Sequence, residues 1–433
     1  MTSDPHHDRG SVPTIHDVEQ EPGAFAAFRV PGFSRIWISL LSGNAGRFSV
    51  LVVAAWEAFR LTRSAFWPSV IAFCILIPVA LVGPVAGTVA DRVNLAKQMA
   101  VGQGLAATSA LVATVFSLAH ALTLPVIAGS TIGVGIGNAI QNPAWSSLVP
   151  SVIGVQRMVN GSAMVRIAQQ GAEFVGPVFA TPLLALAGPS AVYLLCTALY
   201  LTGAGVAISI GRFAPPPQPT RRRVLDSLAD AVRYVVSEQR SAGILLLLVG
   251  LHCGLTMAYT GIIPKVATVN LHGDSGVYGS ILTAVGLGAI GGAIAVILLA
   301  RRLELRFLLV VTAFGSGLSL AVLGFGHEIA VTMTGAVLVG MTQSAFMALY
   351  LALLQGSVAP EMRGRVAAFS NILVGSTMSS AALVWGALVR WISPDWVTAA
   401  PGLLFVMATL VALTLSAWLR PPSVVRLQSV AAS

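Results

Sequence analysis

Three charged residues lie inside long apolar stretches of this sequence: Arg47, Arg166 and Glu173. A charge inside a membrane costs free energy, so an ionisable side chain there is a candidate for a proton, ion or substrate site. Apolar surroundings favour the neutral form of a carboxyl, whereas a nearby guanidinium favours the charged form. Glu173 is therefore the best candidate for a carboxylate that takes up and releases a proton. A static ion pair that only fixes helix packing explains these residues equally well.

The positions of these residues along their apolar runs indicate their depth. At about 1.5 Å of rise per residue, Arg47 lies about 18 Å into the first run, and Glu173 lies about as deep in the fifth. Both fall near the middle of a hydrocarbon core of ~30 Å. Arg166 precedes Glu173 by two helical turns on the same face. Glu57, about 33 Å along the first run, is expected in solvent at the outer interface.

Polar side chains recur on single faces of several apolar runs, and such faces can line a cavity. The cavity candidates are Asn44, Asn138, Gln141, Asn142, Gln169, Gln170, His252, Thr256, Tyr259, Gln343 and Tyr350. Hydrogen bonding between neighbouring helices explains each of these faces almost as well.

The composition indicates that membrane-spanning helices carry these residues. Hydrophobic residues make up 56% of the 433 and charged residues only 9%, whereas soluble globular proteins have about 25% charged residues. Several apolar runs exceed the ~20 residues that cross a bilayer. We therefore expect an all-α integral membrane protein surrounded by lipid. The net charge of +9 does not indicate a nucleic-acid partner, because the positions of the charges matter more than their sum.

Twelve apolar spans are readable, and a polar segment divides them into two sets of six. The predicted parts are an N-terminal tail over 1–34, a six-helix bundle over 35–211, a linker with an amphipathic helix over 212–242, a second six-helix bundle over 243–420, and a C-terminal tail over 421–433. Asp91-Arg92 and Arg301-Arg302 correspond under a shift of 210 residues, and so do Pro150 and Pro360. The two bundles are thus predicted to be pseudo-symmetric repeats, with a substrate site near the midplane between them.

The lysines and arginines fix the expected orientation. With a cytoplasmic N-terminus, nineteen of the 25 fall in cytoplasmic segments, and cytoplasmic loops are enriched in these residues. We expect a multi-pass protein of the cell membrane (inner or plasma membrane) with both termini in the cytoplasm. Residues 1–34 lack the short apolar core of a cleavable signal peptide.

The end of the second span resembles a known signature. The sequence Gly83-x-x-x-Gly87-x-x-x-Asp91-Arg92 is similar to the Gly-x-x-x-Asp-Arg-x-Gly-Arg-Arg loop of the major facilitator superfamily. Asn94 stands where that pattern has its last glycine, so the match is partial. The residues expected to form a gate at the cytoplasmic face are Gly87, Asp91, Arg92, Arg363 and Arg365. Ordinary loop charges that only set the orientation are the alternative.

Further segments resemble one branch of that superfamily, which holds siderophore exporters and macrolide or multidrug efflux pumps. They are Ser42-Gly43-Asn44-Ala45-Gly46, Trp56, Leu148-Val149-Pro150, Gly176-Pro177 and Pro360-Glu361-Met362-Arg363-Gly364-Arg365-Val366. The resemblance implies two six-helix bundles in which the first and fifth helices are neighbours, so we expect Arg47 and Glu173 to pair. It also implies export of an amphipathic molecule, usually driven by the proton gradient. The arginine that drug–proton antiporters often carry in the fourth span is absent from Gly129-Ser130-Thr131-Ile132.

These observations predict a secondary active transporter that exports a small drug-like or siderophore-like molecule by alternating access and proton antiport. Uptake of a small solute is the alternative within transport, and a membrane sensor or structural subunit is the alternative outside it. The sequence has no Walker loop, zincin motif or nucleophile elbow, so we expect no enzyme, no catalytic residue, no metal site and no cofactor beyond the proton gradient. We expect a monomer.

Overall fold

The computed structural model describes residues 26–90, 92–153, 158–211, 224–300, 302–359 and 362–415. These residues form helices joined by short turns, and none of them lies in a strand. The first half contains η2 (Ala26–Arg29), α1 (Phe33–Thr62), α2 (Phe66–Ala90), α3 (Leu95–Leu118), α4 (Leu124–Ile153) and α5 (Met158–Ile210). The second half contains α6 (Val224–Ser237), α7 (Arg240–Thr256), η4 (Ala258–Gly261), α8 (Ile263–Lys265), η5 (Val266–Asn270), α9 (Ser275–Leu299), α10 (Leu305–Gly324), α11 (Ile329–Ser357), α12 (Arg363–Leu388) and α13 (Pro394–Leu415).

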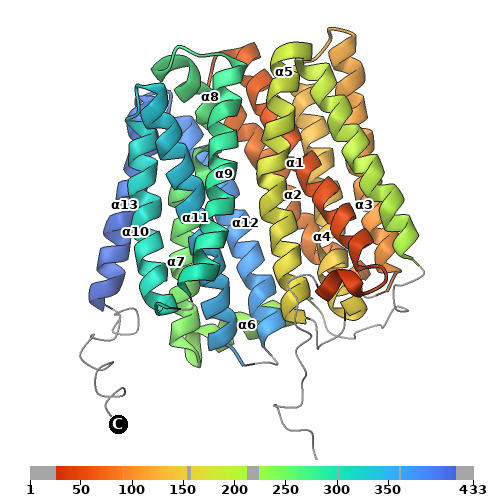
Figure 1. The fold of residues 1–433 in the computed structure, drawn as a ribbon, viewed down its shortest axis with the longest axis vertical. Helices are drawn as coiled ribbons and strands as arrows, with labels where there is room; N and C mark the ends of the chain where they lie inside the picture. Colours follow the sequence, from red (N-terminus) through yellow and green to blue (C-terminus); the bar gives the residue numbers. More distant parts are fainter. Residues whose placement is uncertain are drawn as a thin grey trace, which may run out of the picture.

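Eleven helical stretches of the described residues are long and apolar enough to cross a membrane. One of them lies in α5, whose 53 residues would extend about 80 Å if straight. Gly188 breaks α5 with φ 79° and ψ −176°, a conformation open mainly to glycine. Figure 1 shows the two limbs of α5 running in opposite directions. Since α5 crosses twice, the prediction of an all-α membrane protein with twelve crossings is confirmed.

The helices form two bundles that lie side by side (Figure 1). Helices α1 to α5 pack together in one bundle, and α7 to α13 pack together in the other. Close approach within the first bundle depends on glycine, because a Cβ atom on Gly102 of α3 would meet the backbone of Gly137 in α4. Between the bundles, α2 packs along α12 and α5 packs along α9. These four helices thus form most of the interface between the halves.

One end of this interface is tightly packed. Ser69 of α2 contacts the α-carbon positions of Gly261 and Gly386, so a Cβ on either glycine would collide with it. Both glycines belong to the second half. An apolar cluster at the same end joins Ala65 to Ile262 and to Val266, Val389 and Val397. We call this closed end the α1–α2 end.

The opposite end of the interface is open. On α2, Gly83 lies seven residues, or two turns, after Leu76, a residue that lines the space between the halves. A Cβ atom on Gly83 or on Gly87 would meet nothing within 4 Å. On α12, a Cβ on Gly375 would also meet nothing, although Gly386 three turns later is in tight contact. The halves therefore touch at the α1–α2 end and separate toward the other end.

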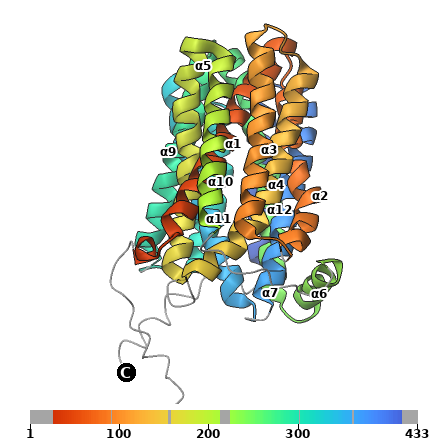
Figure 2. The ribbon, with the colours of Figure 1, turned by 90° about the vertical axis from the view of Figure 1, so that its right-hand side faces the viewer.

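Helix α6 lies across that open end, beneath the second half (Figure 2). Ala231 and Val235 of α6 are buried in the apolar core of the second half. The Asp230 carboxylate accepts a hydrogen bond of 3.1 Å from Arg365 of α12, and the Tyr234 hydroxyl accepts one of 3.1 Å from the backbone N–H of Ala359. Helix α6 is thus fixed to the second half. The remainder of the predicted linker before α6 lies outside the described residues.

Candidate functional site

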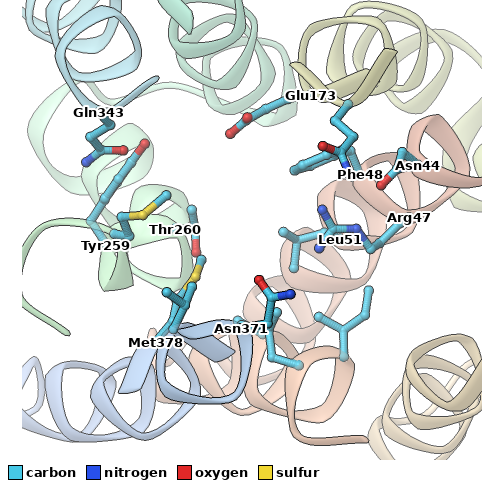
Figure 3. A pocket seen from close by; sticks show the side chains of 16 residues that line it. Asn44, Arg47, Phe48, Leu51, Glu173, Tyr259, Thr260, Gln343, Asn371 and Met378 are labelled. Atoms are coloured by element: carbon cyan, nitrogen blue, oxygen red, sulfur yellow. The ribbon is translucent and has the colours of Figure 1, made fainter. Parts of the chain in front are cut away.

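A cavity of about 360 Å³ lies between the two halves. The first half contributes residues of α1, α2 and α5, and the second half contributes the turn after α7 together with α11 and α12. The lining residues are Asn44, Arg47, Phe48, Leu51, Ala72, Ile75, Leu76, Gln169, Glu173, Met257, Tyr259, Thr260, Gln343, Asn371, Val374 and Met378. Figure 3 shows ten of them with labels, pointing into the cavity from both halves. The cavity has the size of a small-molecule site with a few polar groups in a mainly apolar wall.

A break in the seventh span shapes one wall of the cavity. The α-helix ends at Thr256, and the chain continues as the 3₁₀ turn η4. Carbonyl groups in the last turn of a helix lack intrahelical partners, and side chains of other helices supply them here. Gln343 donates a hydrogen bond of 2.5 Å to the Thr256 carbonyl oxygen, and the Trp385 indole donates one of 3.0 Å to that of Gly254. The break thereby presents Met257, Tyr259 and Thr260 to the cavity.

Of the three charged residues predicted at membrane depth, two have described side chains. Both of these line the cavity, and both belong to the first half. Arg47 of α1 and Glu173 of α5 point into it from neighbouring helices (Figure 3). Among the described residues, no hydrogen bond or ion pair joins these two side chains, so the predicted pair is not formed in this conformation. The Arg47 guanidinium instead lies 4.4 Å from the centroid of the Phe48 ring. The side chains of Arg166 and Gln170 lie outside the described part of the structure.

Four predicted cavity residues line the cavity: Asn44, Gln169, Tyr259 and Gln343. The polar face of α4 does not, because it turns into the interior of the first half. Gln141 there donates a hydrogen bond of 2.6 Å to Asn138, and both residues are buried. Asn142 accepts a hydrogen bond of 3.3 Å from the Trp145 indole. These described hydrogen bonds join residues of α4 itself, so they are neither contacts with a ligand cavity nor the expected bonds between neighbouring helices.

Three predicted residues of the second half also lie away from the cavity. His252 is fully buried, stacks on Phe346 with ring centroids 4.0 Å apart, and lies 3.3 Å from the Ser316 hydroxyl. Thr256 donates a hydrogen bond to the carbonyl of His252. Tyr350 and Ser370 share a hydrogen bond of 2.6 Å between α11 and α12. These side chains hold the second half together.

Other cavity residues were missed by the sequence interpretation, notably Met257, Thr260, Asn371 and Met378. Met257 follows the predicted Thr256 directly, so a continuous helix places it on another face, whereas Thr260 lies one turn after Thr256 on the predicted face and was overlooked. Asn371 carried a usable signal, since it is an amide within an apolar span.

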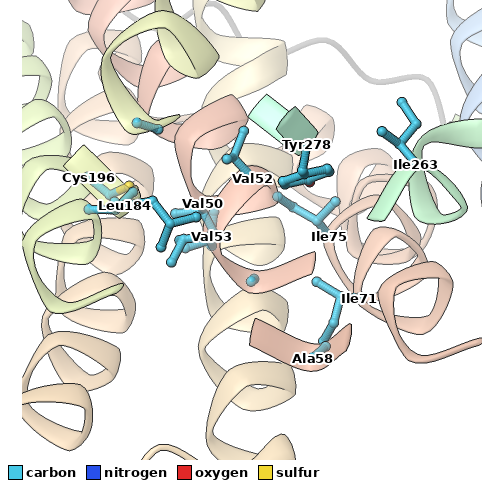
Figure 4. Packing of buried hydrophobic residues seen from close by; sticks show 14 of the residues in the cluster. Val50, Val52, Val53, Ala58, Ile71, Ile75, Leu184, Cys196, Ile263 and Tyr278 are labelled. Carbon is cyan, nitrogen blue, oxygen red and sulfur yellow. The ribbon is translucent and has the colours of Figure 1, made fainter. Parts of the chain in front are cut away.

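The cavity is closed at its α1–α2 end by apolar contacts between the halves. The Trp56 ring of α1 stacks on Tyr278 of α9, with centroids 5.5 Å apart and ring planes 21° apart. Figure 4 shows Tyr278 and Ile263 of the second half beside Val52 and Ile75 of the first. A side pocket of about 50 Å³ lies beneath this contact, and Glu173 lines it as well as the main cavity.

The predicted gate residues lie at the open end. The contacts that the structure describes for their side chains join residues of the same half. Arg365 pairs with Asp230 of α6, and Arg363 donates a hydrogen bond of 3.2 Å to the Val358 carbonyl that follows α11. Arg92 is exposed, Gly87 faces open space, and Asp91 lies outside the described residues. In this conformation Arg363 and Arg365 therefore organise the second half.

The expectation that Glu57 lies in solvent is wrong. Its side chain is 2% exposed, and its carboxylate pairs with Arg60 one helical turn later at 2.6 Å. Arg60 itself is about half exposed, so its long side chain carries the charge to the surface while Glu57 stays buried.

Among the described residues, no three His, Cys, Asp or Glu side chains gather as a metal site requires.

Comparisons with known proteins agree with this architecture. The family model of transmembrane secretion effectors matches residues 22–424. The enterobactin exporter EntS of Citrobacter koseri is 25% identical over 282 residues, which cover 65% of this chain and 67% of that protein. A POT family transporter in complex with 5-aminolevulinic acid has a TM-score of 0.73 at 12% identity, covering 90% of this chain and 97% of that one. A peptide transporter POT in complex with sulfate has a TM-score of 0.70 at 11% identity, covering 89% and 94%. At these identities the solved structures show a shared fold.

Proposed function

This chain belongs to the transmembrane secretion effector family of major facilitator transporters, and we propose that it exports a small amphipathic molecule by alternating access, coupled to proton entry. The observation that carries the proposal is the cavity between the halves, closed at the α1–α2 end and lined by both halves. A site at the interface of two repeats can face either side of the membrane as the halves rock. Similarity to an enterobactin exporter supports export as the direction.

The charge distribution supports an orientation for this conformation. The positive-inside rule puts the end that carries α6, together with both termini, in the cytoplasm. In that orientation the protein belongs to the inner or plasma membrane, and its cavity is open to the cytoplasm. An exporter loads its substrate in this state. We propose that the protein works as a monomer, since each chain contains a complete cavity.

Glu173 is the proposed proton carrier. Its carboxylate lines the cavity, and among the described residues it forms no ion pair that would hold it permanently charged. A carboxyl in mainly apolar surroundings changes its protonation with modest changes in its environment. In the proposed cycle, substrate binding from the cytoplasm releases the proton of Glu173, and a proton from outside restores it after the substrate has left. The driving force is then the proton gradient, with no bound cofactor.

The test is efflux of amphipathic dyes and of siderophores such as enterobactin from energised cells, with and without a protonophore. We expect efflux that stops when the gradient collapses, and loss of gradient-driven efflux in Glu173→Gln. Glu57→Gln is the matched control, because Glu57 is a membrane carboxylate outside the cavity, and it should retain efflux. Gradient-driven accumulation of the compounds would show uptake instead. Unchanged, still proton-driven efflux in Glu173→Gln would remove Glu173 from the mechanism.

A further inference from the structure

The cavity contains an arginine and a glutamate that form no direct ion pair with each other. Arg47 and Glu173 line the same 360 Å³ space, yet no hydrogen bond or ion pair connects them in the described structure. Opposite charges at membrane depth gain free energy by pairing, and unpaired charges there are costly. Two such groups that share a cavity without pairing are available to a ligand.

Phe48 lies beside both residues. The Arg47 guanidinium lies over the Phe48 ring at 4.4 Å, an arrangement in which the ring face partly stabilises the cation. Phe48 also lines both the main cavity and the side pocket, beside Glu173. In Figure 3 the labelled Phe48 stands between the Arg47 and Glu173 side chains. From this position we expect the ring to limit the approach of Arg47 to Glu173.

The facing wall is neutral. The second half contributes the hydroxyls of Tyr259 and Thr260 and the amides of Gln343 and Asn371. Its apolar contribution includes Met257 and Met378, whose flexible thioethers adapt to varied shapes. This wall is suited to the uncharged body of a ligand, whereas the wall of the first half is suited to its charged groups.

We infer that the cavity takes a zwitterionic amphipathic molecule, whose acidic group binds Arg47, whose ammonium group binds Glu173, and whose apolar body lies against the second half. This inference rests on the proposed function, because it takes the cavity as the substrate site. Each contact is a charge-assisted hydrogen bond, which is stronger than a neutral one. A zwitterion neutralises both residues and adds no net charge to the membrane interior.

The charge of the ligand also decides how it couples to protons. An acid alone would leave Glu173 facing a second anion, so its binding would favour protonation of Glu173 rather than proton release. An amine alone would leave Arg47 without a counterion. A zwitterion presents an ammonium group that competes with the proton for Glu173, as exchange of substrate for protons requires. The other polar residues that line the cavity with Glu173 are Asn44, Arg47, Gln169, Tyr259, Thr260, Gln343 and Asn371.

The test is calorimetric binding to the purified full chain in detergent, with three probe classes of matched length. ω-Amino acids of four to eight carbons carry both charges, the corresponding fatty acids carry only the acid, and the alkylamines carry only the amine. We expect one ω-amino acid to bind at least about tenfold more tightly than its fatty acid and its amine. Titration in buffers of different ionisation enthalpy should show proton release with the ω-amino acid and none with the fatty acid.

Two variants assign the two ends of the ligand. Arg47→Gln should reduce ω-amino acid binding to the level of the alkylamine, and Glu173→Gln should reduce it to the level of the fatty acid and abolish proton release. Asn371→Leu alters the neutral wall without removing a charge, and it should preserve the preference for the zwitterion over the two singly charged probes. Phe48→Ala should weaken binding of the ω-amino acid by allowing Arg47 and Glu173 to approach each other.

The inference is overturned if the unmodified protein binds the fatty acid or the amine as tightly as the ω-amino acid. It is also overturned if none of the three probes binds to protein that is shown to be folded by its cooperative unfolding. Neither result bears on export, which the efflux assay measures separately. If the ω-amino acid binds as expected but cells show no gradient-driven efflux of any compound, the ligand class stands and the proposed function fails.

Discussion

The side-chain amide of Gln343 in α11 donates a hydrogen bond of 2.5 Å to the carbonyl oxygen of Thr256, the last residue of α7. That carbonyl has no intrahelical partner, because the chain leaves the α-helix at this point. Gln343 also lines the cavity. One residue therefore stabilises the break in the seventh span and forms part of the surface that the break exposes to a ligand.

The first prediction concerns Gln343→Leu. Removal of the amide leaves a buried carbonyl without its donor, which costs about 1–3 kcal/mol of folding free energy. We expect a lower apparent Tm in detergent, measured by tryptophan fluorescence, and weaker substrate binding because η4 loses its anchor. The matched control is Asn371→Leu, which removes an amide from the same cavity wall.

The control should retain its apparent Tm, because among the described residues Asn371 makes no hydrogen bond and exposed substitutions change stability by only about 0.5 kcal/mol. An unchanged Tm in Gln343→Leu, or an equal loss in both variants, would contradict the anchoring role of Gln343.

Much of the fold is predictable from the sequence, because the bilayer allows few solutions. Spanning segments must satisfy their own backbone hydrogen bonds, so long apolar runs have to be helices. The break after Thr256 was not predictable in this way. Its carbonyl groups are satisfied by Gln343 and Trp385, residues of two other helices that are distant in the sequence. A hydropathy pattern records neither partner.

The candidate site was predictable where charge made a residue rare, and less so elsewhere. Arg47 and Glu173 were found because so few charges lie at membrane depth, and both line the cavity. Gln141 donates a hydrogen bond to Asn138 inside the first half, because a polar face in the sequence does not reveal which neighbour it meets. Glu57 was wrongly predicted to be exposed, because its distance along the helix indicates only its depth in the membrane. Whether its side chain is buried depends on the ion pair with Arg60 one turn later.

A second prediction concerns the ion pair between Asp230 of α6 and Arg365 of α12, which are separated by 3.1 Å. Both side chains are partly exposed, so the pair contributes about 1 kcal/mol or less. Asp230→Arg places two cations together and should loosen α6, which we expect to detect as faster proteolysis of the segment before α7. The swap Asp230→Arg with Arg365→Asp should restore resistance.

Failure of the swap to restore resistance would mean that α6 is held only by its other contacts, namely buried Ala231 and Val235 and the Tyr234 hydroxyl. Asp274→Asn is a suitable control, because Asp274 caps α9 and has no part in the attachment of α6.

The last prediction concerns the closed end of the cavity, where Gly386 of α12 contacts Ser69 of α2. Gly386→Val inserts atoms into a tight contact, at a cost of about 1–3 kcal/mol. That cost applies only while the halves touch at this end, so it shifts the equilibrium toward the state open there. Gly375→Val is the matched control on the same helix, because a Cβ at Gly375 meets nothing within 4 Å.

Access to the cavity reports this shift. Thr260→Cys places a thiol on the cavity wall, and the three native cysteines are buried. A membrane-impermeant maleimide added outside intact cells should label Cys at this position about fivefold faster or more in the Gly386→Val background, as a shift of 1 kcal/mol or more requires. The Gly375→Val background should leave the labelling rate unchanged. Equal labelling in both backgrounds would mean that the contact between Ser69 and Gly386 does not limit opening. The apolar contacts at this end, between Trp56 and Tyr278 and around Ala65 and Val389, would then be sufficient to hold it closed.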